Sequence, residues 1–320
     1  MKGLTDIPGI RVGHASDYEA LTGCTVILCE AGAVAGADIR GSATGTEEFP
    51  ALEPSHIVDR IHAVVLAGGS AFGLEAASGV RRYLEQKGVG FETGAAKVPI
   101  VPCAILYDLG IGKAGVRPTR EMGEAAAVAA TAGAVREGAV GAGTGATCGK
   151  IHGMKQAMKS GIGSATVALE GQHSGVLVSA LVANNAFGDI VDPADGRIVA
   201  GARRGPDSRE FADSAAVLKR GRPRAPFSPA NTTLVVVATN AQLTKVQARK
   251  LAQLAQLGMA RAIRPVNTMV DGDLVVALSL GQAKADVDAL GVAAAEAVVE
   301  AILRSVRLAK SLGGVPGLAG

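Results

Sequence analysis

The sequence has few aromatic residues and no tryptophan: Phe, Trp and Tyr make up 3% of its 320 residues. So few rings argue against a platform on which nucleic-acid bases stack. The 32 basic and 29 acidic residues leave a net charge of +3, which is too balanced for a nucleic-acid footprint. We therefore expect no nucleic-acid partner.

Features of zinc sites, membrane spans and secretion are missing as well. No Cys-x-x-Cys pair and no Cys/His spacing typical of zinc occurs among the four cysteines Cys24, Cys29, Cys103 and Cys148. No run approaches 18 uncharged apolar residues, and the first 20 residues contain no apolar signal core. We expect a cytoplasmic protein with reduced cysteines, no metal or other cofactor and no membrane partner.

The composition that remains favours a core of short side chains. Hydrophobic residues make up 48% of the chain, and 43 residues are glycine. Elements of Ala, Val, Leu and Gly can pack closely without disulfides. A chain of this length can form one α/β domain, so we predict a single domain over residues 1–320.

Apolar segments of strand length alternate with Ala-rich helical patterns, which predicts an α/β fold. The strand candidates include "CTVILC", "AVVLAGG", "GVLVSALVANN" and "DLVVALSL". Gly88 is placed to cap one helix, and Thr244 with Gln247 forms a capping box at the start of another. Helices are predicted over residues 73–87, 120–136, about 245–259 and roughly 284–310.

One segment departs from this alternation. Residues 199–230 are charged and contain Pro206, Pro223, Pro226 and Pro229. Such a segment buries little apolar area, so we expect an exposed linker. It leads directly to "NTTLVVVATN", a buried strand pattern that begins with threonines.

Two glycine-rich segments suggest sites for anions. "GAGTGATCGK" (141–150) has Thr144 and Ile151 where a phosphate-binding loop needs Gly and Ser or Thr, so we interpret it as a turn that delivers Lys150. "LAGGSAFGLEAA" places Gly69 and Ser70 before a helix, where N–H groups either bind a substrate carboxylate or oxyanion or simply allow tight packing. Ser70 lacks the Gly-x-Ser-x-Gly context of a hydrolase nucleophile.

None of the five histidines lies in a recognisable triad or His-Glu-x-x-His spacing, so a nucleophile would need another base. A threonine at a chain terminus carries its own base, the α-amine, whose pKa is near 8. Thr232 could become such a terminus if its hydroxyl attacked the carbonyl of Asn231 and the chain were then cut. The alternative is an ordinary threonine at a strand edge.

Polar residues elsewhere could complete such a site. Asp271 and Asp273 flank Gly272, and two carboxylates so close could orient an amine and a hydroxyl, or simply form a polar turn. Asn184 and Asn185 end a buried run, where an amide either donates to an oxyanion or caps a turn.

With these motifs the sequence resembles the self-cleaving L-aminopeptidase/D-amidase/D-esterase family, which includes β-peptidyl aminopeptidases and nylon-oligomer hydrolases. The resemblance covers nearly the whole chain and includes "TDIPGIRVGH", "DIRGSATGTEE", "LAGGSAFGLEAASGV", "GAGTGATCGK", "ANNAFGD" and "DGDLVVALS". It implies a four-layer αββα sandwich. It also implies cleavage before Thr232 into subunits 1–231 and 232–320 that stay together and form a homotetramer of heterodimers.

The resemblance also implies roles for individual residues. Thr232 is the nucleophile, Asn185 and Tyr107 stabilise the oxyanion, and Lys150 polarises the nucleophile region. Asp271 and Asp273 orient the Thr232 amine. Asn185 is favoured over Asn184 because it precedes the Ala-Phe-Gly turn, and Lys159 is a rival to Lys150.

The expected function is hydrolysis of a small peptide or amide by an N-terminal threonine hydrolase, as an aminopeptidase, amidase or oligoamide hydrolase. Two alternatives stay open. The related ornithine acetyltransferases also cut themselves before Thr, which would make the reaction acyl transfer. A chain that stays uncut would be a non-catalytic binding protein.

Overall fold

The computed structural model describes residues 1–221 and 231–319. In it, one long strand, β2 (Thr22–Ile39), is shared by two sheets. Its first half pairs with β1 (Arg11–Asp17) and β4 (Ile61–Ala67), and its second half pairs with β16 (Leu274–Ala283). The pairing with β4 shifts register between Leu28 and Ala33, where the strand passes from one sheet to the other.

The remaining strands extend the two sheets away from β2. The first sheet continues through β4 to β7 (Cys103–Ile105) and β3 (Thr46–Glu47). The second continues through β16 to β14 (Thr232–Ala241), β11 (Leu177–Asn185) and β10 (Ile162–Ala168). Small sheets are formed by β12 (Asp189–Val191), β13 (Ile198–Ala200) and β15 (Ile263–Arg264), by β5 (Phe91–Glu92) and β6 (Lys97–Val98), and by β8 (Thr147–Cys148) and β9 (Met158–Lys159).

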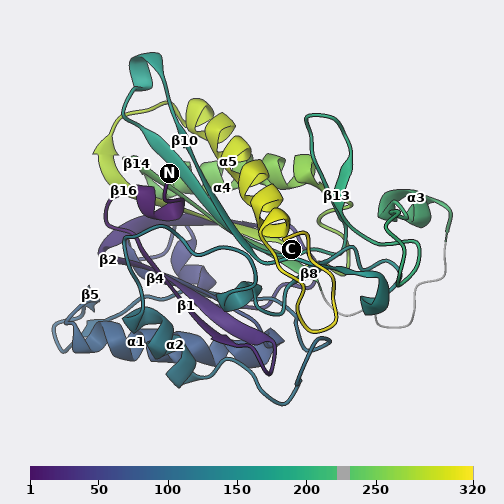
Figure 1. Ribbon diagram of the computed structural model, residues 1–320. Helices are drawn as coiled ribbons and strands as arrows, with labels where there is room; N and C mark the ends of the chain where they lie inside the picture. The colour runs from purple at the N-terminus through teal and green to yellow at the C-terminus, as the bar shows by residue number, and fades with distance from the viewer. Residues whose placement is uncertain (222–230, 320) are drawn as a thin grey trace.

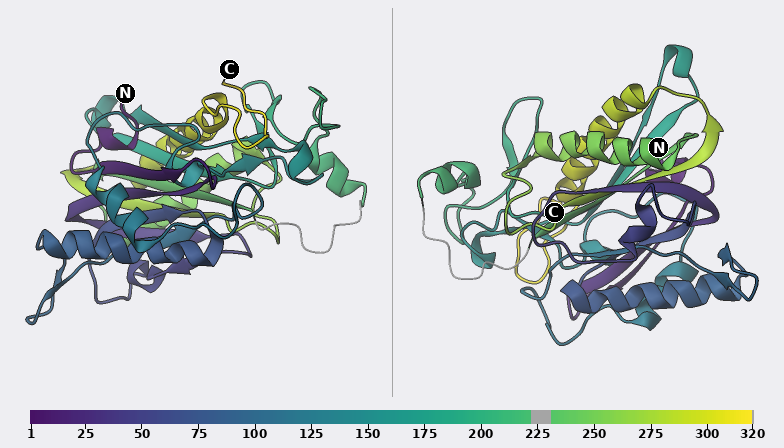
Figure 2. Two further views of the ribbon diagram at one scale, coloured as in Figure 1. Left: turned by 60° about the horizontal axis from the view of Figure 1, so that its bottom comes forward. Right: turned by 180° about the vertical axis from the view of Figure 1, so that it is seen from behind.

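Helices cover the outer faces of both sheets. α4 (Lys245–Ala262) and α5 (Val287–Arg307) pack on the sheet that contains β14 and β16, while α1 (Ala76–Gln86) and α2 (Arg120–Val128) pack on the sheet that contains β1 and β4. Figures 1 and 2 show the two helix pairs on opposite sides of the strands. The predicted αββα sandwich is thus confirmed.

Three hydrophobic clusters separate these four layers. On β14, Val235 and Val237 belong to the cluster beneath α4 and α5, whereas Leu234 and Val236 belong to the cluster between the sheets. A third cluster lies between β1, β4 and the helices α1 and α2. Because alternate residues of a strand face opposite sides, a strand buried on both faces must be apolar throughout. This explains the unbroken run from Leu234 to Ala238.

All four predicted helices are present; three are shorter than predicted, and α4 extends to Ala262. α1 begins only at Ala76, because residues 70–75 form 3-10 turns, and Gly88 follows it with a positive φ of 67°, as expected of a capping glycine. The capping box of Thr244 and Gln247 is present at the start of α4. The prediction for residues 120–136 was too long. α2 ends at Val128 because Thr131 pairs in an extended bridge with Val12.

The predicted exposed linker over residues 199–230 was wrong for the part that the structure describes. Residues 199–221 contain the end of β13 and a short helix, α3 (Ser214–Lys219). The buried carboxylate of Asp189 accepts hydrogen bonds from the N–H groups of Ala202 and Ser214 and from the Ser214 hydroxyl. This one side chain ties the segment to the body of the protein. Pro223, Pro226 and Pro229 lie outside the described residues.

Glycines allow close contact between helices and strands, and one such contact gives a test of the packing. A Cβ at Gly163 on β10 would lie 1.9 Å from the carbonyl oxygen of Ala301 on α5. We predict that Gly163→Ala lowers the free energy of unfolding by about 2–3 kcal/mol, because backbone must move. Urea unfolding measures this, with Gly115→Ala as the control because its Cβ meets no atom within 4 Å. Equal midpoints for the two variants would contradict the packing.

Candidate active site

Thr232 is the first residue of β14 and is fixed by strands on both sides. β11 runs antiparallel to β14 and places Asn185 opposite Thr232, while β16 runs parallel and places Leu274 opposite Leu234. The threonine is only 1% exposed. The pairing with Asn185 and the burial together hold Thr232 in place at the start of the strand. A threonine in an exposed loop would have neither constraint.

The peptide bond before Thr232 is held equally firmly. The Asn231 N–H donates to the Val270 carbonyl at 3.0 Å, and the Asn231 carbonyl accepts from the Gly272 N–H at 2.6 Å. The Thr232 hydroxyl donates to the same carbonyl, also at 2.6 Å. The predicted nucleophile therefore lies directly beside the carbonyl that it would attack, and that carbonyl carries two hydrogen-bond donors.

The two aspartates that follow Val270 are both buried beside this peptide. Asp273 accepts from the N–H groups of Thr233 at 2.6 Å and Asn267 at 2.9 Å. Asp271 accepts from the N–H and hydroxyl of Thr268 and from the N–H of Phe187. Asp273 thus holds the backbone that follows Thr232, while Asp271 holds the neighbouring residues Thr268 and Phe187.

Asn185, Lys150 and Tyr107 form one connected group on the other edge of β14. The Lys150 ammonium donates to the Asn185 backbone carbonyl at 2.9 Å and to its side-chain oxygen at 2.7 Å. That oxygen also accepts from the Thr147 N–H, and the Asn185 amide nitrogen donates to the Tyr107 carbonyl at 2.9 Å. One amide hydrogen of Asn185 stays available for a further acceptor. The Tyr107 side chain lines a small pocket together with Lys150.

Burial shifts the pKa of the charged groups in the site. Desolvation lowers the pKa of Lys150 to about 7, against the opposing effect of the negative Asp271. Desolvation, and then the charge of Asp271, raises the pKa of Asp273 to about 7. The pKa of Asp271 is raised as well, mainly by burial. Groups that change protonation near neutral pH suit proton transfer and are typical of active sites.

The structure separates the rival residues that the sequence left open. The Asn184 amide donates to Ser305 on α5, so it faces away from Asn185, as alternation along a strand requires. Lys159 is fully buried and donates three hydrogen bonds, to the carbonyls of Gly143, Ala146 and Ser160. All three ammonium hydrogens are used, so Lys159 secures the loop before Lys150 and leaves the contact with Asn185 to Lys150.

The turn at Gly69 and Ser70 is held internally. The Gly69 N–H donates to the carboxylate of Asp108 at 2.7 Å, and the Ser70 N–H donates to the Leu106 carbonyl. Neither N–H is left for a bound carboxylate. The positive φ of both residues, 79° and 55°, fits a tight turn.

Sequence reasoning missed the loop that supports the two aspartates. The N–H groups of Arg40 and Gly41 donate to the Asp273 carbonyl, and the Ala43 N–H donates to the Asp271 carbonyl at 2.8 Å. A Cβ on Gly41 would lie 2.2 Å from the Asp273 nitrogen, so only glycine fits. The motif "DIRGSATGTEE" contains these residues, but nothing in their type points to residues 230 positions away.

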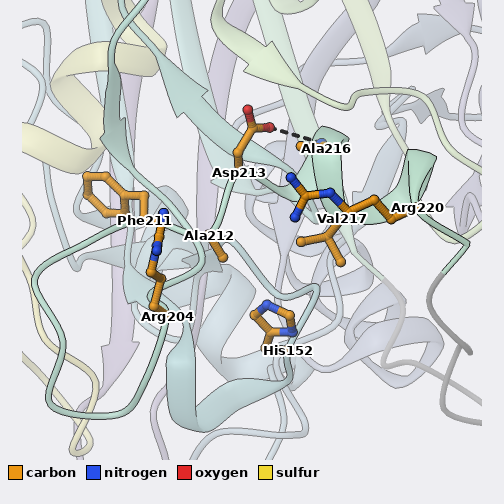
Figure 3. A pocket seen from close by; sticks show the side chains of 8 residues that line it. All are labelled: His152, Arg204, Phe211, Ala212, Asp213, Ala216, Val217 and Arg220. Atoms are coloured by element: carbon orange, nitrogen blue, oxygen red, sulfur yellow. Dashed lines mark hydrogen bonds between the residues drawn. The ribbon is translucent and has the colours of Figure 1, made fainter.

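A cavity of about 530 Å³ lies outside this cluster. Figure 3 shows that two arginines, a histidine and the Phe211 ring surround it. Its lining shares no residue with the group around Thr232 and consists of His152, Arg204, Phe211, Ala212, Asp213, Ala216, Val217 and Arg220. The cavity is therefore separate from the cluster around Thr232.

The family model of peptidase family S58 matches residues 2–319. The chain belongs to peptidase family S58. An uncharacterized aminopeptidase of Mycobacterium leprae is 38% identical over 356 residues, covering 100% of this chain and 94% of that protein. A 6-aminohexanoate-oligomer endohydrolase of Kocuria sp. is 32% identical, covering 94% of this chain and 85% of that protein.

A solved structure supports the fold. The L-aminopeptidase D-Ala-esterase/amidase from Ochrobactrum anthropi, a variant of the Ntn hydrolase fold, matches with a TM-score of 0.73 at 19% identity. The match covers 98% of this chain and 88% of that structure. Membership of family S58 confirms the resemblance found in the sequence and makes the chain an amide hydrolase, and it does not favour acyl transfer or a non-catalytic binding role.

Metal clusters and membrane-spanning helices are both absent from the residues that the structure describes. Within residues 1–221 and 231–319, no three His, Cys, Asp or Glu side chains come together in a way that could hold a metal ion. No helix in the same residues has the length and apolar character needed to span a membrane.

The lowered pKa of Lys150 in this site predicts that the stability of the folded protein depends on pH. Between pH 7 and the ordinary lysine pKa of 10.5, the unfolded chain binds a proton that folded Lys150 lacks, so the free energy of unfolding rises with pH. We predict that Lys150→Met reduces this rise by roughly 1 kcal/mol per pH unit between about pH 7 and 8.5.

Urea unfolding at several pH values measures that slope. The proteins carry Thr232→Ala, which removes the hydroxyl that the expected self-cleavage needs, and Lys250→Met, at an exposed position, is the control. Equal slopes with and without Lys150 would place its folded pKa near the ordinary range and contradict the prediction.

Proposed function

We propose that this amide hydrolase activates itself by cutting before Thr232 and then uses Thr232 as an N-terminal nucleophile. The observation that carries the proposal is the buried Thr232 hydroxyl, held 2.6 Å from the carbonyl oxygen of Asn231. Fixed strands on both sides keep these groups together. A reaction within one chain between groups held so close has a large entropic advantage.

Self-cleavage would proceed through an ester. The Thr232 oxygen bonds to the Asn231 carbonyl carbon, the bond from that carbon to the Thr232 nitrogen breaks, and the hydroxyl proton ends on that nitrogen. Water then hydrolyses the ester. The products are a carboxylate on Asn231 and a free amine and hydroxyl on Thr232.

The new amine would serve as the base for hydrolysis of other molecules. An α-amine has a pKa near 8 and can accept the hydroxyl proton as Thr232 attacks a substrate carbonyl. The proposal gives Asp271 and Asp273 the role of holding this amine, because Asp273 accepts from the Thr233 N–H and Asp271 lies opposite Asn231. Asn185 has an amide hydrogen for the oxyanion, Lys150 positions Asn185, and Tyr107 lines the adjoining pocket.

The two fragments would stay together because the shorter one is built into the core. Residues 232–320 supply β14, β16, α4 and α5. β14 lies between β11 of the longer fragment and β16, and β16 pairs with β2. Assembly of the cut chains into a homotetramer stays a prediction.

The substrate class proposed is a small peptide or amide. The relatives point to two types of chemistry: one is named as an aminopeptidase, and another as a hydrolase of 6-aminohexanoate oligomers. Both types fit attack on an amide carbonyl by a single nucleophile. We propose an aminopeptidase, amidase or oligoamide hydrolase activity.

Cleavage gives a direct test by mass. The chain of 320 residues has a mass of 32.0 kDa, or about 0.1 kDa per residue, so the fragments are expected at roughly 23 and 9 kDa. Intact mass under denaturing conditions and N-terminal sequencing of the small fragment measure this. The small fragment should begin Thr-Thr-Leu-Val.

Two variants of Thr232 sharpen this test. Thr232→Ala should stay whole and inactive, whereas Thr232→Ser keeps a hydroxyl and should still be cut. Cleavage at another bond, or in the alanine variant, would contradict the proposal.

The proposed role of Asn185 predicts that its loss slows the hydrolysis of substrates but leaves self-cleavage of the chain intact. We predict that Asn185→Ala lowers the hydrolysis rate per cut chain by roughly a hundredfold, as expected for a lost oxyanion donor. The assay uses amino-acid amides and 6-aminohexanoate oligomers as substrates. Asn184→Ala is the matched control, because the Asn184 amide faces Ser305 and should affect stability instead of rate. A near-normal rate in cut Asn185→Ala would remove Asn185 from the site.

A further inference from the structure

We propose that the backbone N–H of Gly272 is the oxyanion donor for self-cleavage, and that the later hydrolysis of substrates uses a different donor, Asn185. The inference rests on the proposed self-cleavage before Thr232. Negative charge forms on the Asn231 carbonyl oxygen during cleavage, and the backbone of Gly272, a residue without a side chain, would stabilise it.

The contact that carries the inference is the Gly272 N–H donating to the Asn231 carbonyl oxygen at 2.6 Å. When the Thr232 oxygen bonds to the Asn231 carbonyl carbon, the π electron pair of that carbonyl moves onto its oxygen. The pair returns when the bond to the Thr232 nitrogen breaks. A donor that already points at this oxygen needs no rearrangement as the charge forms, which is how an oxyanion hole lowers a barrier.

The donor belongs to an isolated parallel bridge that lies just before the β14–β16 ladder. Asn231 lies opposite Asp271 in the same register that places Leu234 opposite Leu274. In such a ladder the residue after Asp271 donates to the carbonyl of Asn231. This bridge, in register with the pairing of β14 and β16, therefore supplies the donor to the scissile bond.

The peptide group that contains this N–H is held at its other end as well. The carbonyl of Asp271 belongs to the same peptide unit and accepts from the Ala43 N–H at 2.8 Å. A peptide group that accepts at one end and donates at the other is polarised in the direction that strengthens the donated bond. The loop around Ala43 thus fixes both the position and the strength of the donor.

Glycine is the residue that fits here. A Cβ at position 272 would lie 2.7 Å from the Thr232 hydroxyl oxygen and 2.8 Å from the Ala43 carbonyl oxygen. Either contact would displace the nucleophile or the loop that holds the donor. The absence of a side chain lets the backbone approach the scissile bond.

The two oxyanion donors lie on opposite edges of β14. Asn185 is on β11, the neighbour on one edge, and Gly272 lies two residues before β16, the neighbour on the other. The Asn231 carbonyl accepts on the β16 edge, away from the Asn185 amide. Once the bond is cut, Asn231 no longer continues into β14, and the Gly272 donor has completed its reaction.

An amide-to-ester exchange at Gly272 tests this donor. Cell-free translation of the full chain can place glycolic acid at position 272, which replaces the N–H by oxygen and adds no atoms near Thr232. The matched control places glycolic acid at Gly41, whose N–H donates to the Asp273 carbonyl at 3.0 Å in the same cluster. Both proteins lose one backbone hydrogen bond, but only one loses the bond to the scissile carbonyl.

The rate of appearance of the roughly 23 and 9 kDa fragments is measured in the protease-resistant, folded fraction of each protein. We expect the ester at 272 to be cut about a hundredfold more slowly than the ester at 41, the typical effect of losing an oxyanion donor. Among chains that have been cut, the hydrolysis rate should be the same for both. Equal cutting rates for the two esters would overturn the inference. So would a hydrolysis rate of cut chains with the ester at 272 that falls as much as its cutting rate.

The unmodified chain separates this inference from the proposed function. If the unmodified chain stays whole, self-cleavage itself is refuted. If it is cut and the ester at 272 is cut equally fast, only the assignment of Gly272 fails.

Discussion

The site depends on pairing at the start of β14, with β11 on one edge and with the segment before β16 on the other. Pairing with β11 sets Thr232 opposite Asn185, and pairing with the segment before β16 sets Asn231 opposite Asp271. The hydroxyl, the carbonyl beside it and the two carboxylates are therefore positioned by sheet register. A slip of one residue would turn the Thr232 side chain to the other face and separate it from its neighbours.

The same burial that fixes the site makes it electrostatically unusual. A lysine and two aspartates lie out of water, and burial moves the pKa of Lys150 and Asp273 toward neutrality from opposite directions. Each group keeps its hydrogen bonds, which offsets part of the desolvation. Such groups add little to stability, so their presence in an otherwise apolar sheet interior fits a role in chemistry. In contrast, Lys159 uses every hydrogen on backbone carbonyls, as a structural group does.

The sequence predicted what depends on local pattern. A threonine at the start of an apolar run, adjacent asparagines at the end of another and a capping box at Thr244 were all read from neighbouring residues. What it could not predict depends on distant contacts. α2 ends early because Thr131 pairs with Val12, and residues 199–221 are docked because Asp189 binds Ser214. The roles expected of Thr232, Asn185 and the aspartates stay predictions about chemistry.

The high glycine content of this protein bears directly on the backbone contacts at its candidate site. A chain with 43 glycines and few aromatic residues can bring backbone segments into direct contact where other proteins separate them by side chains. At Gly41 and Gly272 this contact places peptide N–H groups against the carbonyls of Asp273 and Asn231. Peptide groups in a rigid sheet have fixed dipoles, which makes them well suited to stabilising charge. Short residues therefore both allow the layers to pack and provide donors at the proposed cleavage site.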